Sequence, residues 1–141
     1  MIWWPEPTAG DIVWCRFPPH ESIPGTIKAR PTLVIRTISL EPQDGRCWVV
    51  VAYGTSQKTS RIHRDEFLIS KFKHPEAYRV AGLSRDTKFC FSKVAKLPFN
   101  DIFFAPPPHA PYGETPKLGS LHPIMMSDAR AAFGAKKEGT H

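Results

Sequence analysis

The sequence predicts a mainly β protein: a small half-open barrel of five to seven mostly antiparallel strands, with short helices that include one near the C-terminus. Short apolar runs recur between turn signals such as Gly10-Asp11 and Asp44-Gly45, a pattern typical of a meandering sheet. Fifteen prolines in 141 residues are about twice the average share of about 5% and disfavour long helices. Hydrophobic residues form 41% of the chain, enough to bury a core, so we expect one domain over residues 1–141.

The expected strands follow one another through the first two thirds of the chain. Asp11–Phe17 alternates between two faces, as a strand does. Later apolar runs predict strands at 29–35, 46–53, 65–70 and 86–94. In the last run we expect Phe89 and Phe91 to face inward, and Lys88, Cys90 and Ser92 to lie on the opposite face.

The remaining segments are expected to be less regular. They are an extended arm over 1–9, a loop over 18–28, one helical turn within 75–83, a proline-rich segment over 105–123 and a helix over about 121–134. Ser120 would cap that last helix, or Ser127 would cap a shorter one. The irregular segments therefore lie mainly at the two ends of the chain and in the long loop after the first strand.

Charge and cysteine content limit the kind of protein. A net charge of +6 and a pI near 9.4 favour an anionic partner, either nucleic acid or an acidic protein. Cys15, Cys47 and Cys90 are widely spaced, which is typical of buried, reduced thiols and gives neither a disulfide framework nor a metal site. No apolar run approaches the roughly 20 residues that span a bilayer, and the N-terminus has no signal-peptide pattern. We expect a cytoplasmic protein that does not associate with membranes and needs no cofactor.

The first candidate site residues are Arg30, at the start of one expected strand, and Thr55, at the end of the next. Strands joined by a short loop run antiparallel, so the start of one and the end of the next meet at the same edge of the sheet. A guanidinium beside a hydroxyl suits a phosphate, which arginine can hold with two hydrogen bonds. The plainer alternatives are a surface arginine paired with a carboxylate, and ordinary turn chemistry in Gly54-Thr55-Ser56.

Further polar residues flank this pair, and we expect them to bind substrate. They are Lys28, Ser56, Gln57 and Lys58 along the same edge, with His20 and Glu21 in the long loop. If that loop folds over Arg30, His20 or Glu21 could carry a proton, because histidine titrates near neutral pH. A loop histidine is more often simply solvated. Lys58, Arg61, His63 and Arg64 form a second local positive surface.

Several of these segments resemble the MazF/PemK/Kid family of bacterial toxins, and PemK-like members in particular. The similarity lies in Gly10-Asp11-Ile12-Val13-Trp14, Arg30-Pro31-Thr32-Leu33-Val34-Ile35 and Thr55-Ser56-Gln57, with a fainter match at Ala81-Gly82-Leu83. These segments span about residues 8–97 in the family's order. The proline-rich segment has no counterpart in the family pattern.

The resemblance implies an SH3-like barrel that forms a homodimer and cleaves single-stranded messenger RNA at specific sequences without a metal. It implies that the ribose 2′-OH attacks the adjacent phosphodiester, that Arg30 and Thr55 are catalytic, and that a cognate antitoxin protein blocks the site. It does not identify the general base. The alternative is a catalytically inactive barrel of the same kind that binds nucleic acid or protein.

Overall fold

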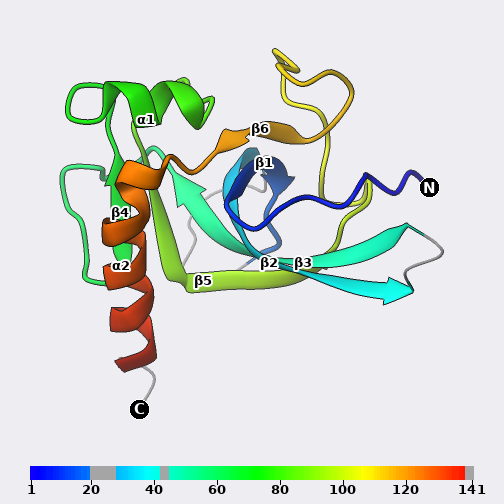
Figure 1. Cartoon of the computed structure of the whole chain (residues 1–141), viewed down its shortest axis with the longest axis horizontal. Coiled ribbons are helices and arrows are strands. Elements are labelled where there is room, and N and C mark those ends of the chain that lie inside the picture. Colours follow the sequence, from blue (N-terminus) through cyan, green and yellow to red (C-terminus); the bar gives the residue numbers. More distant parts are fainter. Residues whose placement is uncertain (20–27, 42–44, 139–141) are drawn as a thin grey trace.

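A single antiparallel sheet of six strands curls into a half-barrel, in the order β4-β5-β3-β2-β1-β6 (Figure 1). The structure is a computed structural model that describes residues 1–19, 28–41 and 45–138. The strands are β1 (Asp11–Arg16), β2 (Ala29–Glu41), β3 (Arg46–Thr55), β4 (Glu66–Ile69), β5 (Thr87–Pro98) and β6 (Lys117–Ser120). The helices are α1 (Pro75–Val80), the 3₁₀ turn η1 (Pro123–Met125) and α2 (Met126–Glu138). The predicted fold class, including the helix near the C-terminus, is confirmed.

The two faces of the sheet carry separate apolar cores, because successive side chains of a strand point to opposite faces. On one face, which we call the helix-side core, α2 packs against β4 and β5. Its aromatic centre is Phe91, whose ring lies 5.8 Å from that of Phe67 and 5.4 Å from that of Phe133 on α2. Figure 1 shows α2 running beside these two strands.

The other face is covered by the N-terminal arm and by the segment that follows β5; we call it the arm-side core. Trp4 in the arm is buried and donates its indole N–H to the Phe104 carbonyl at 3.1 Å. Phe99 and Phe104 pack against each other in the same core, with their rings tilted by 58° and the ring centroids 4.8 Å apart. The strands contribute Val13, Cys15, Val34, Val49, Val51 and Tyr53 to this core. The N-terminal arm and the segment after β5 therefore cover this face of the sheet, as helix α2 covers the opposite face.

The C-terminal part departs most from the sequence-based expectation. Residues 117–120 form β6, which pairs with β1, although the sequence indicated no strand there. Ser120 belongs to that strand and caps no helix, so this cap prediction is wrong. Instead, the His122 Nδ1 accepts the backbone N–H of Ile124 at 3.0 Å and caps η1, from which α2 continues.

Lys88 and Cys90 lie opposite the phenylalanines of β5 as expected, but both are buried. The Lys88 ammonium lies 3.2 Å from the Glu66 carboxylate on the neighbouring strand, and the side chains of both residues are less than 10% exposed. A lysine is seldom fully buried without such a partner, because an unpaired charge in the interior is strongly destabilising. Among the described residues, no helix is long and apolar enough to span a membrane.

The turn between α1 and β5 rests against the backbone of β6. A Cβ added at Gly82, whose φ is +70°, would lie 2.0 Å from the Leu118 carbonyl oxygen. One added at Gly119 would lie 2.3 Å from the Val80 carbonyl oxygen. Real Cβ atoms do not approach so closely, so both positions require glycine. This contact holds the turn 83–86 over the end of the sheet.

Candidate functional site

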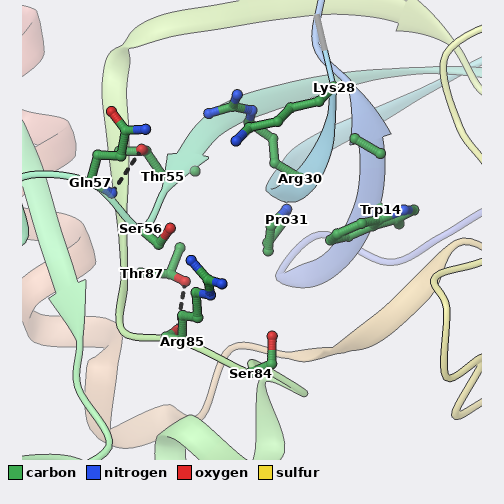
Figure 2. Close-up of a pocket in the computed structure, with 12 residues that line it drawn as sticks. Trp14, Lys28, Arg30, Pro31, Thr55, Ser56, Gln57, Ser84, Arg85 and Thr87 are labelled. Carbon is green, nitrogen blue, oxygen red and sulfur yellow. Dashed lines mark hydrogen bonds between the residues drawn. The ribbon is translucent and has the colours of Figure 1, made fainter.

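A pocket of about 250 Å³ opens at the end of the sheet where β2 begins and β3 ends (Figure 2). We call it the strand-end pocket. Its wall consists of Trp14, Lys28, Ala29, Arg30, Pro31, Gly54, Thr55, Ser56, Gln57, Ser84, Arg85 and Thr87. Among these lining residues are three cations and four hydroxyl groups but no carboxylate and no imidazole. Such a wall favours an anion.

The register of β2 and β3 brings Arg30 and Thr55 to this pocket. Thr32 pairs with Tyr53, and two residues further along the two antiparallel strands reach Arg30 and Thr55. Figure 2 shows the Arg30 and Lys28 side chains reaching toward Thr55. Gly54 permits this approach of the strands, because a Cβ there would lie 2.3 Å from the Pro31 carbonyl oxygen and 2.9 Å from the Phe89 ring.

Tyr53 holds the Arg30 guanidinium in place. Its hydroxyl oxygen accepts a hydrogen bond from Nη1, and its ring centroid lies 4.8 Å from the Arg30 Cζ. Tyr53 is itself buried and packs edge-on against Phe17, with centroids 5.3 Å apart. A guanidinium has five N–H donors. Tyr53 uses one of them, so an oriented fork of donors remains for a ligand.

The Thr55 hydroxyl is oriented by the turn that follows it. The backbone N–H of Gln57 donates to Thr55 Oγ1 at 3.1 Å. Because a hydroxyl has one proton and two acceptor lone pairs, the bond leaves the Thr55 proton available to donate. Thr55 is partly exposed, whereas Ser56 and Gln57 are exposed. This turn therefore presents donors to the pocket.

The sequence-predicted residues divide into three groups by position. Lys28, Arg30, Thr55, Ser56 and Gln57 line the strand-end pocket. Lys58 follows at the start of an exposed loop, with φ of +53°, and does not line it. His20 and Glu21 lie outside the described residues, so the predicted proton carriers have no position here.

The loop between β3 and β4 is anchored by the buried ion pair. The Lys88 ammonium donates to the Arg61 carbonyl oxygen at 3.0 Å, and the Glu66 carboxylate accepts the backbone N–H of His63 at 2.8 Å. The side chains of Arg61 and His63 remain exposed on this loop. The buried ion pair therefore fixes the backbone of the loop that carries the second group of cations expected from the sequence.

Sequence reasoning missed Trp14, Ser84, Arg85 and Thr87 as lining residues. A signal was available for Arg85: it precedes β5, and β5 runs antiparallel to β3. The turn before β5 therefore lies at the edge where β3 ends. The role of Tyr53 as the partner of Arg30 depends on the pairing register and has no signal in the sequence.

The cysteines do not supply a nucleophile at neutral pH. Burial raises the pKa of Cys15 to about 12, a shift that the Thr32 hydrogen bond only partly offsets, and burial chiefly raises that of Cys47 to about 11. Burial also raises the pKa of Cys90. All three thiols therefore stay protonated, and none of them lines the strand-end pocket. Within the described part of the chain, no three His, Cys, Asp or Glu side chains gather as a metal site would require.

Comparison of the sequence with protein-family models gives no match, and comparison with curated proteins gives none either. Functional assignment therefore depends on the chemistry of the strand-end pocket.

Proposed function

We propose that the strand-end pocket binds a phosphodiester of single-stranded RNA and that the protein is a metal-independent, sequence-specific endoribonuclease. The observation that carries this proposal is the convergence of Arg30 and Thr55 in a pocket whose described wall has cations and hydroxyls but no carboxylate. A phosphate is the anion for which an arginine fork and a hydroxyl donor are well matched.

RNA carries its own nucleophile, the ribose 2′-OH, so the protein need not supply one. The ribose 2′-oxygen bonds to the adjacent phosphorus while the bond to the 5′-oxygen breaks, which leaves a 2′,3′-cyclic phosphate and a 5′-hydroxyl. The 2′-OH proton passes to a base, and the departing 5′-oxygen takes a proton from an acid. Arg30 would neutralise the charge that builds on the phosphoryl oxygens, and Thr55 would donate a hydrogen bond to one of them.

The same features support the biological role implied by the resemblance. A metal-independent ribonuclease of this kind would act as the toxin of a toxin–antitoxin pair and cleave messenger RNA in the cytoplasm. A cognate antitoxin would cover the positive pocket, and a homodimer would present two such pockets. The net charge of +6 favours both an RNA substrate and an acidic inhibitor.

A second candidate function is a non-enzymatic barrel that binds RNA. It is favoured by one observation: no carboxylate or imidazole is among the described residues of the pocket wall, so that wall shows no general base. Lys28, Arg30 and the basic loop after β3 would then retain RNA without cutting it. Affinity would fall steeply with salt, because each phosphate contact releases a condensed counterion.

One experiment separates the two functions. The purified full chain is incubated with a long transcript in the presence of EDTA, and the product ends are mapped. We expect cuts at a short recurring sequence with 2′,3′-cyclic phosphate ends, and a loss of about 10²–10³ in rate for Arg30→Gln. Arg36→Gln, an exposed arginine on the same strand but away from the strand-end pocket, is the matched control and should cleave normally. RNA that is retained but left intact would establish the binding function instead, and full activity of Arg30→Gln would remove the site.

A further inference from the structure

We infer that Arg85 is a second phosphate-binding residue, so that the strand-end pocket takes a nucleotide together with the phosphate on each side of it. This rests on the proposed function in that it assumes an RNA strand as the ligand. Arg30 with Thr55 would hold the first phosphate and Arg85 with Ser84 the next. The ligand class is therefore a stretch of single-stranded RNA with two successive phosphates, rather than an isolated phosphate group.

The Arg85 side chain is exposed and lines the pocket, yet its guanidinium has no hydrogen bond or ion pair within the described parts of the chain. The nearest carboxylate in sequence is Asp86, and it is engaged elsewhere, because its Oδ1 accepts the backbone N–H of Lys71 at 2.9 Å. Arg85 therefore faces the pocket as an uncompensated cation.

The backbone that carries Arg85 is held from two directions. The Thr87 hydroxyl donates to the Arg85 carbonyl oxygen at 2.9 Å, and the close contact between Gly82 and the Leu118 carbonyl fixes the start of the turn. The backbone at Arg85 is thus already fixed before a ligand binds, which lowers the entropy lost when the side chain binds that ligand.

Arg30 and Arg85 reach the pocket from different elements. Figure 2 shows Arg30 and Lys28 on one side, Arg85 and Ser84 on the other, and Ser56 and Thr87 between them. Like charges in one pocket repel each other, so the arrangement is stabilised when anions bind. Trp14 and Pro31 add apolar surface to the same wall, and an indole is a surface on which a base stacks. Cations on two sides with an aromatic ring in the wall fit a base flanked by two phosphates.

The test measures binding of dinucleotides that cannot be cleaved. Dinucleotides with 2′-O-methyl groups and mixed base composition are prepared without a terminal phosphate, with a 5′-phosphate and with a 3′-phosphate. Isothermal titration calorimetry compares their affinities for the full chain. We expect one of the two terminal phosphates to tighten binding to the wild type about tenfold, as a hydrogen bond to a charged group does. Arg85→Gln should lose this gain and bind the dinucleotide without a terminal phosphate about as well as the wild type, whereas Arg30→Gln should weaken all three.

Arg79→Gln is the matched control, because Arg79 is an exposed arginine of α1 that pairs with Glu76 and does not line the pocket. Arg79→Gln should bind the three dinucleotides as the wild type does. Arg85→Lys should show part of the increase in affinity that the terminal phosphate gives the wild type. A wild type that binds none of the dinucleotides, or all of them equally, would overturn the inference, as would a gain that survives in Arg85→Gln. Because the probes cannot be cleaved, loss of the gain in Arg85→Gln supports the inference even if the protein does not cut RNA. A protein that cuts RNA but shows no gain loses only this inference.

Discussion

Two of the hollows that the described residues line differ in the chemistry of their walls. The strand-end pocket, of about 250 Å³, is lined by cations and hydroxyl groups. The second hollow, which we call the helix-side groove, has about 480 Å³ and lies between α2 and β2. Its wall includes Leu33, Ile35, Phe91, Leu121, Met126 and Phe133. Arg130 is the one charged residue among the described residues that line it.

Size and wall chemistry point to different members of this pair as the candidate ligand site. The largest apolar pocket is the usual first hypothesis for a ligand site. Here the larger groove is bordered by residues of the helix-side core, such as Leu33 and Phe91, so packing explains its wall. The smaller pocket is bordered in part by polar side chains that belong to neither apolar core, and Arg30 and Arg85 are among them. Mutations should therefore separate a region that sustains the fold from one that binds the ligand.

The largest expected effect is on the fold. Phe91→Ala removes a buried ring that contacts Phe67 and Phe133, and it should lower the free energy of unfolding by about 3–5 kcal/mol. RNA affinity per folded molecule should not change. Urea unfolding measures the first quantity and titration of the folded fraction the second. Phe72→Ala is the control, because Phe72 is 92% exposed and its removal should cost little. An equal loss from both variants would contradict the assignment of the helix-side core.

Thr55→Val tests the strand-end pocket with little change in side-chain size, although it also removes the exposed hydrogen bond from the Gln57 backbone. It replaces a hydroxyl by a methyl group, and the lost hydrogen bond to a charged phosphoryl oxygen is worth about 1.5–3 kcal/mol. The cleavage rate should fall about 10–100-fold while the unfolding free energy stays near that of the wild type. Single-turnover cleavage of a short RNA measures the rate. Thr55→Ser should keep most activity, and Thr37→Val, at a distant position on β2, should keep all of it. An active Thr55→Val would show that this hydroxyl donates nothing.

Gly54→Ala should affect both regions at once. The added Cβ would lie 2.3 Å from the Pro31 oxygen in the pocket wall and 2.9 Å from the Phe89 ring in the helix-side core. Such overpacking typically costs about 1–3 kcal/mol, and we expect RNA affinity to fall with stability. Gly134→Ala has nothing within 4 Å of the new Cβ and should be neutral or stabilising. Normal RNA affinity in Gly54→Ala would show that packing changes at this residue alter the helix-side core without altering the strand-end pocket.

The last effect is absent at neutral pH, appears only in alkaline solution and lies in the arm-side core. Burial raises the pKa of Cys15 from 9.0 to about 12. The unfolded thiol therefore loses its proton at lower pH than the folded one, and the unfolded state binds fewer protons between these values. The contribution of the Cys15 thiol to the free energy of unfolding is fully present below pH 9.0 and is lost as the pH rises toward about 12. Urea unfolding at neutral and alkaline pH should show a smaller decline for Cys15→Ala than for the wild type. An equal decline of the unfolding free energy in the wild type and Cys15→Ala would indicate that other titrating groups cause the loss of stability at alkaline pH.

The fold class could be predicted because alternation in β1 and the apolar runs of β2 and β3 are local signals. The strand β6 could not, because these four residues lie within the segment expected to be proline-rich and irregular, and they form a strand only through pairing with β1. Lys88 was expected on the face opposite the phenylalanines of β5. Its burial depends on Glu66 of the adjacent strand, which periodicity within one strand does not reveal.

The candidate site was predictable where antiparallel geometry alone brings residues together, as with Arg30 and Thr55. Arg85 reaches the same pocket through the path of the turn before β5, and Trp14 reaches it through the position of β1. The path of that turn and the position of that strand depend on tertiary packing, which local sequence signals do not reveal. The predicted proton carriers, His20 and Glu21, lie outside the described residues, and no carboxylate or imidazole is among the residues of the described wall.

The contact between Gly82 and the backbone of β6 also links the order of translation to completion of the site. Every side chain that lines the strand-end pocket is synthesised before residue 88, but β6 is made well after them. A chain growing on the ribosome therefore contains every residue of the pocket wall before it has the strand against which the turn bearing Arg85 rests.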